Sequence, residues 1–217
     1  MAYTQTDSAK TGSGRLLLLA VLFTVFQITG MVLSTMVGGL DLPWILISLL
    51  MAIVCFAMYF AYRSHSKNLM KPMLGAALML QLVIELDWGG YYLQYIGEVT
   101  ELYKSESAFA IYAMVQILIL FVIAGINVMH YVINASHHSN PKKVKFNQAL
   151  WAAYIVLVAI QCVCFILLDS TAMFAVGDCL TSVSDVFAMG IVICIESSMD
   201  EFRLAREAKA NEENEEN

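Results

Sequence analysis

Six long apolar runs, separated by short polar and charged segments, make up most of the chain. Each run is long enough for a helix that crosses a bilayer, which takes about 20 residues. The pattern predicts an all-α fold, a polytopic transmembrane bundle whose six spans cover about residues 15–37, 43–63, 72–96, 107–135, 147–168 and 172–196.

Composition supports this prediction. Of the 217 residues, 59% are hydrophobic and only 14% are charged, and the mean hydropathy is +0.70. These values lie outside the range of ordinary soluble domains. We therefore expect an integral membrane protein in contact with the lipid bilayer, and no binding of nucleic acid.

The charged residues predict the orientation, because cytoplasmic loops of membrane proteins are enriched in Lys and Arg. Basic residues gather before the first span, after the second, before the fifth and after the sixth. These positions share one side of the bundle, so both termini are predicted to be cytoplasmic. The expected organisation is an N-terminal segment over 1–14, a bundle over 15–200 and an acidic tail over 201–217, whose acidic end at 212–216 we interpret as disordered.

Proline and glycine positions predict how continuous the helices are. Pro43, Pro72 and Pro141 follow polar residues at the starts of spans, where proline fits the first helical turn, so no proline kink is expected. Gly89 and Gly90 lie within the third span and permit a local break.

Four carboxylates lie within the predicted spans: Glu85, Asp87, Asp178 and Asp185. No Lys or Arg lies in the interior of any span. An ionised acid at that depth costs about 2.5–3.5 kcal/mol, and such residues are normally paired, hydrated or protonated. Carboxylates inside the spans without a basic partner in the same spans indicate an ion or proton pathway.

The sixth span carries the clearest pattern. Asp178, Thr181, Ser182 and Asp185 follow the spacing i, i+3, i+4 and i+7, which places them in one stripe on one helix face. We expect this face to avoid lipid. Asp185 falls near mid-membrane, and Asp178 about 10 Å nearer the outer surface. The alternative is that these acids serve only as hydrogen-bonding groups between helices.

Other candidate residues lie on the third and fourth spans. Glu85 and Asp87 point about 200° apart around their helix, so we place Asp87 near the outer interface among aromatic residues. Asn127 and His130 belong to a polar stripe on the fourth span, which is predicted to face the bundle interior beside the sixth span. A polar connection from His130 to Asp185 would favour a proton route. Packed apolar residues between them would leave two isolated structural sites.

Part of the last third of the chain resembles the microbial rhodopsins. Leu150-Trp151-Ala152-Ala153-Tyr154 is similar to the L-W-x-A-Y stretch of their sixth helix. The helix that follows has Asp185 where those proteins carry the retinal lysine, and Ile155 replaces the proline expected after the tyrosine. A retinal Schiff base requires a lysine amine, so the resemblance implies at most a rhodopsin-like bundle without the retinal link.

Motifs of known enzymes are absent from the sequence. The five cysteines lie in apolar runs without metal-ligand spacing. We therefore predict no cofactor and no metal site, and the sequence favours a protein that is not an enzyme without deciding the point. The leading hypothesis is a channel or transporter for protons or cations that uses intramembrane carboxylates. The alternatives are a non-catalytic integral membrane subunit of a larger complex and a membrane sensor. A homo-oligomer or a partner in a membrane complex is compatible with each of them.

Overall fold

The protein is all-helical, as predicted. The computed structural model describes the backbone of residues 3–39, 41–64, 66–94, 107–135, 141–168 and 171–215 and most of the side chains there. Within these residues there are helices and connecting turns but no strand. The helices are α1 (Tyr3–Gly38), α2 (Leu42–Arg63), α3 (Lys67–Gln94), α5 (Ser107–Ala135), α6 (Pro141–Leu168) and α7 (Ala172–Glu215).

Four of these helices are long and apolar enough to cross a membrane. The crossing stretches are Ser13–Gly38 in α1, Leu42–Arg63 in α2, Lys145–Leu167 in α6 and Ala172–Ile195 in α7. In α3 and α5, which correspond to the third and fourth predicted spans, the apolar stretches among the described residues are shorter, Asn68–Ile84 and Met114–Ile126. These features are those of an integral membrane protein.

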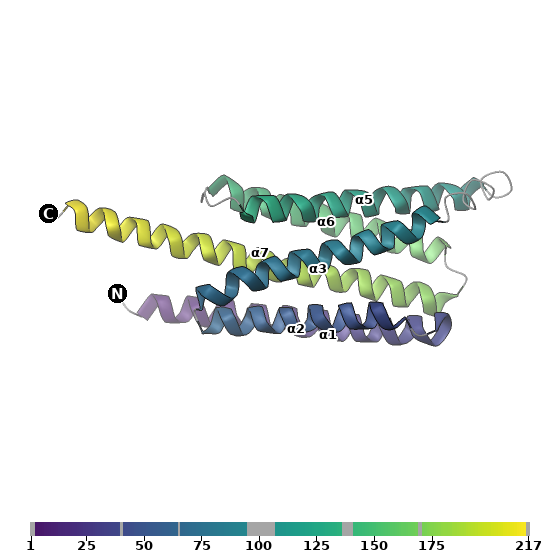
Figure 1. Ribbon diagram of the computed structural model, residues 1–217, viewed down its shortest axis with the longest axis horizontal. Coiled ribbons are helices and arrows are strands. Elements are labelled where there is room, and N and C mark those ends of the chain that lie inside the picture. Colours follow the sequence, from purple (N-terminus) through teal and green to yellow (C-terminus); the bar gives the residue numbers. More distant parts are fainter. Residues whose placement is uncertain are drawn as a thin grey trace.

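The helices form three layers (Figure 1). Helices α1 and α2 lie on one side, α5 and α6 lie on the other, and α3 and α7 pass between them. Because α7 contacts α1, α2, α3 and α6, 56% of its apolar stretch is buried, against 28–33% in the other three crossing helices. The first turn of α1 and the last turn of α7 lie at the same end of the bundle (Figure 1), which we call the terminal end; the opposite end is the distal end.

Helix starts agree with the proline positions in two of three cases. Asp41 is the N-cap of α2, where its side chain accepts a hydrogen bond from the Trp44 N–H at 3.2 Å, and Pro43 occupies the first turn. Pro141 is the first residue of α6. Both prolines occupy positions where their missing N–H costs no helical hydrogen bond.

Pro72 differs from the prediction, because it lies inside α3 rather than at its start. Helix α3 begins at Lys67, where the Met70 N–H already donates to the Ser66 carbonyl at 3.0 Å. A proline at this point removes one backbone hydrogen bond of the helix. The helix also continues through Gly89 and Gly90 to Gln94 without a break.

The acidic C-terminal tail also differs from the prediction. We interpreted its acidic end as disordered, but α7 continues as a helix to Glu215. Residues 201–210 combine Glu, Arg, Ala, Lys and Leu, all strong helix formers. A high content of charge therefore does not prevent a helix here, because it extends one that the bundle has already nucleated.

Helices α1 and α7 make the most extensive helix contact in the structure, and glycines allow it. A Cβ on Gly30 would lie 2.7 Å from the Gly177 carbonyl oxygen, and one on Gly177 would lie 3.0 Å from the Gly30 carbonyl oxygen. Ser34 and Thr181 follow these glycines by four residues. Small residues four apart on both helices are typical of close packing between membrane helices.

A buried apolar cluster fills the terminal half of the bundle. It combines residues within 16–23 of α1, 51–62 of α2, 70–78 of α3 and 188–195 of α7, and we call it the terminal apolar core. Large apolar side chains also cover the outer surface of the helices, among them Leu18, Leu46, Ile53, Phe60 and Ile166. Such a surface suits contact with lipid, while polar groups are kept inside.

Candidate functional site

The candidate site lies on the central helix, α7, whose two halves differ in polarity. Between Asp178 and Asp185 the helix carries five polar side chains, whereas the following ten residues, 186–195, include no charged or hydroxyl-bearing side chain. Asp178, Thr181 and Ser182 are buried, and Asp185 is partly buried. The stripe therefore faces the interior of the helix bundle.

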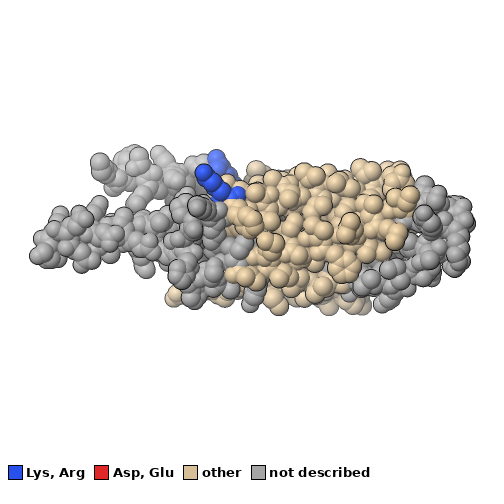
Figure 2. All heavy atoms as spheres, turned by 90° about the horizontal axis from the view of Figure 1, so that it is seen from above, with Lys and Arg blue, Asp and Glu red and all other residues tan. Residues whose placement is uncertain are grey.

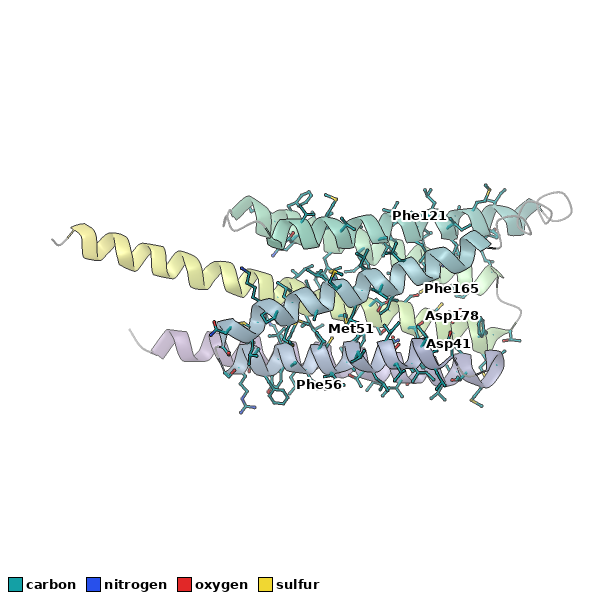
Figure 3. All side chains as sticks on the ribbon, in the orientation of Figure 1. Asp41, Met51, Phe56, Phe121, Phe165 and Asp178 are labelled. Carbon is teal, nitrogen blue, oxygen red and sulfur yellow. The ribbon has the colours of Figure 1, made fainter. Side chains whose placement is uncertain are left out.

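Asp178 joins α7 to α1. The Ser34 hydroxyl donates a hydrogen bond to Asp178 Oδ1 at 3.0 Å, and both side chains are buried. The absence of a side chain on Gly177 brings the two helices close enough for this contact. Figure 3 shows Asp178 toward the same end of the bundle as Asp41, with Met51 nearer the middle. Asp178 therefore lies in the distal half of α7.

Hydroxyl and amide groups continue from this point across three helices. The Thr181 hydroxyl donates to the Asp178 carbonyl at 2.9 Å. The Ser184 hydroxyl contacts both the Thr181 carbonyl and Gln27 Oε1. The Gln27 amide in turn donates to Ser48 Oγ at 2.7 Å. This network connects α7 through α1 to α2 and satisfies polar groups that would be costly to bury alone.

Asp185 faces a different set of partners. Gln81 of α3 is the neighbour that most favours the charged form of its carboxyl group. The Gln81 amide nitrogen donates to the hydroxyl oxygen of Tyr154, a fully buried residue of α6, at 3.1 Å. Neutral polar groups of α3 and α6 therefore lie beside Asp185.

A small polar cavity lies against Asp185. Its volume is about 20 Å³, which is enough for a water molecule. Asp185 is the only acidic residue in its lining, which consists of Gln27, Trp44, Ile84, Tyr154, Gln161, Thr181, Ser182 and Asp185. The residues come from α1, α2, α3, α6 and α7, so five helices meet at one carboxyl group.

Toward the terminal end the cavity meets a closed apolar layer. On each of four helices, a buried apolar side chain lies one turn from a polar one, on the side of the terminal end. The pairs are Gln27 and Phe23 on α1, Ser48 and Met51 on α2, Gln81 and Leu78 on α3, and Asp185 and Ala188 on α7. Each of the four apolar side chains is at most 2% exposed and belongs to the terminal apolar core. The site is therefore polar toward the distal end and sealed toward the terminal end.

The structure brings together only part of the predicted site. Thr181, Ser182 and Asp185 line the cavity, but Asp178 does not, because it faces Ser34 on α1. The remaining candidates have helical backbones in α3 or α5, but their side chains lie outside the described residues: Glu85, Asp87, Asn127 and His130.

Among the described residues, α5 packs mainly against α3 and α6. The prediction that Asn127 and His130 face the bundle interior beside the sixth span concerns side chains outside the described residues. The side chains between α5 and its neighbours are apolar, including Ile119, Ile123 and Val158, with Val183 and Val186 of α7 packed against them. A continuous polar connection from Asp185 toward α5 is not present in this described packing. Gln116 on α5 is buried and its amide makes no hydrogen bond within the described part of the chain.

Several neutral residues of the site were missed by the sequence analysis. They are Gln27, Ser34, Trp44, Ser48, Gln81 and Gln161. The usable signal was an amide in an otherwise apolar run, which requires a buried partner just as a carboxylate does.

Cysteine and metal chemistry add nothing to this site in the described residues. None of the five cysteines, all of which lie in described helices, forms a disulfide bond, and the described residues contain no group of three or more His, Cys, Asp or Glu side chains placed to bind a metal. Comparisons with protein-family models, with curated proteins and with solved structures found no match to this chain.

Proposed function

We propose that this protein moves protons or small monovalent cations across a membrane through the site at Asp185. The observation that carries this proposal is the cavity itself: one carboxyl group at the meeting point of five helices, open to hydrogen bonding and next to space for a water molecule. A carboxyl group that only stabilised helix packing would not require such space. Intramembrane acids in the bundle interior commonly mark ion and proton pathways.

The distal and terminal halves of the bundle differ in polarity, and this difference supports ion entry from the distal end. The ion approaches from the distal end, where Asp178, Thr181 and Ser182 make the interior polar. The terminal apolar core then blocks further movement. Passage therefore requires a conformational change that opens this core, as in a carrier that exposes its site to one side at a time, rather than in a permanently open channel.

The cavity volume favours a small occupant. About 20 Å³ admits water or a dehydrated monovalent cation but not an organic solute. Gln27, Gln161 and Thr181, whose side chains carry oxygen atoms, line the cavity together with Asp185, and oxygen ligands suit hard cations. A proton held on Asp185 and relayed by water needs the same groups.

The proposal includes six spans with both termini in the cytoplasm. Each of the four predicted basic clusters then lies inside, and the distal end becomes the outer end. Glu85 and Asp87 on α3 contribute to the outer entrance. Asn127 and His130, near the end of α5, form the cytoplasmic exit once the terminal apolar core opens.

Ion flux in proteoliposomes tests this function. Wild-type protein, reconstituted alone, is expected to dissipate an imposed proton or sodium gradient. Asp185→Asn keeps the shape and hydrogen bonding of the side chain but removes its charge, so flux should fall at least about tenfold while the helical content is unchanged. Asp178→Asn is the matched control, because Asp178 lies outside the cavity. It should reduce flux less.

Two results would reject the proposal. Equal flux in wild type and Asp185→Asn would remove Asp185 from the pathway. No flux by folded wild-type protein with any small cation would leave the membrane-subunit hypothesis, in which these polar groups serve assembly with a partner.

A further inference from the structure

We infer that the turn between α2 and α3 binds an anionic phospholipid, independently of ion transport. An open groove of about 650 Å³ lies at the terminal end of α2, lined by Ala57, Phe60, Ala61, Arg63, Ser64 and Leu69. Its walls are mostly apolar, and its polar groups are at the end of the span. This arrangement matches a lipid, which has an apolar chain and a charged head.

The apolar part of the groove continues along the outer face of α2. Ala57 and Phe60 lie on the same face as Ile53, because these residues are three and four positions apart. Phe60 is 60% exposed and Ile53 is 64% exposed. An acyl chain lying along this face would cover both side chains and run toward the middle of the membrane.

Arg63 is held at the polar end of the groove. Its Nη1 group donates a hydrogen bond to the hydroxyl oxygen of Tyr59 at 3.2 Å, and Tyr59 is buried. This contact uses one of the five N–H donors of the guanidinium group. The rest of the group remains available to a phosphate, which arginine can bind with two parallel hydrogen bonds.

Charge at this end of the bundle favours an anionic head group. The basic residues with described side chains, Arg15, Arg63, Lys71 and Lys145, all lie toward the terminal end, since the helices alternate in direction. Figure 2 shows Lys and Arg side chains at one end of the described surface, with no Asp or Glu coloured among the described residues of that face. Lys71 is exposed and lies two residues after Leu69 on α3. Basic residues at this level of a membrane protein attract anionic lipids.

Native mass spectrometry of the purified protein tests the inference. With phosphatidylglycerol and phosphatidylcholine supplied together, the wild type should retain phosphatidylglycerol preferentially. Arg63→Gln should weaken its binding about tenfold, the effect of losing one charge-assisted contact, whereas Arg63→Lys should retain the preference. Ala57→Phe should reduce binding of both lipids by filling the groove.

Matched controls separate this site from general charge and bulk. Lys145→Gln removes an exposed charge on α6 at the same end of the bundle, and Leu118→Phe adds bulk to an exposed position of α5 outside the groove. Neither should change lipid retention. Equal effects of Arg63→Gln and Lys145→Gln would overturn the inference, as would an unchanged lipid load in Ala57→Phe. Full displacement of lipid by inorganic phosphate would also overturn it, because the site would then recognise a free anion. These outcomes do not depend on whether Asp185 transports ions.

Discussion

Ser34 and Asp178 show how a hydroxyl group on one helix helps to stabilise a buried carboxyl group on the next. Ser34→Ala removes the donor that contacts Asp178 Oδ1 at 3.0 Å. Because hydrogen bonds to buried polar groups are costly to lose, we expect the free energy of unfolding in detergent to fall by about 1–3 kcal/mol. Thr29→Ala is the control, since the exposed Thr29 hydroxyl contacts only its own helix at Val25. A loss of stability no larger than that of the control would contradict this role of Ser34.

At the same scale, the polar residues of the α7 stripe could be predicted, whereas the neutral residues that the other helices contribute to the site were not. Asp185 and Asp178 stand out because an acid in an apolar span needs compensation. The two acids have different surroundings because a different helix faces each of them. Gln81 of α3 is a neighbour of Asp185, and Ser34 of α1 contacts Asp178. The spacing along α7 predicts that the two acids lie on one face of the helix. It does not identify which neighbouring helix each acid contacts.

Among the helices, the contact between α1 and α7 depends on glycine at two positions. Gly30→Ala would place a Cβ 2.7 Å from both the Gly177 carbonyl oxygen and Thr181 Cγ2, so the helices must separate. We expect a loss of about 1–3 kcal/mol in the free energy of unfolding, the usual effect of overpacking. Gly125→Ala on α5 is the matched control, because nothing lies within 4 Å of its Cβ position.

The control in this pair should move in the opposite direction. Alanine is favoured over glycine inside a helix by about 0.5–1 kcal/mol, so Gly125→Ala should be neutral or slightly stabilising in a thermal unfolding measurement. If both variants lost the same stability, steric contact at Gly30 would not be the cause.

The end of a helix could be predicted from the sequence where it coincides with the end of an apolar run. It could not be predicted where the helix continues beyond the apolar run into polar residues. The second apolar run, at 43–63, agrees with α2 to within a residue. The sixth run ends at 196, yet α7 continues to Glu215. Hydropathy identifies the part of a helix that lies in lipid, whereas the polar extension is stabilised by helix propensity and by its attachment to the bundle.

The arrangement of the whole molecule predicts which loops face each side of the membrane. Thr171, before α7, lies at the distal end, and Ser64, after α2, lies at the terminal end. Thr171→Cys should therefore react with a membrane-impermeant thiol reagent added outside intact cells, and Ser64→Cys should react only after the cells are opened. The native cysteines all lie in apolar helices, so unmodified protein provides the background. The reverse pattern would invert the assigned orientation.

Infrared difference spectroscopy of the reconstituted protein tests the central claim most directly, because it observes exchange at the Asp185 carboxyl group itself. On changing the pH or the sodium concentration at the distal face, we expect a change in a carboxyl C=O band of the wild type. The same band should be absent from Asp185→Asn and retained in Asp178→Asn. A wild-type spectrum that does not respond to either change, or a response that persists unchanged in Asp185→Asn, would contradict the assignment of Asp185 as the exchanging site.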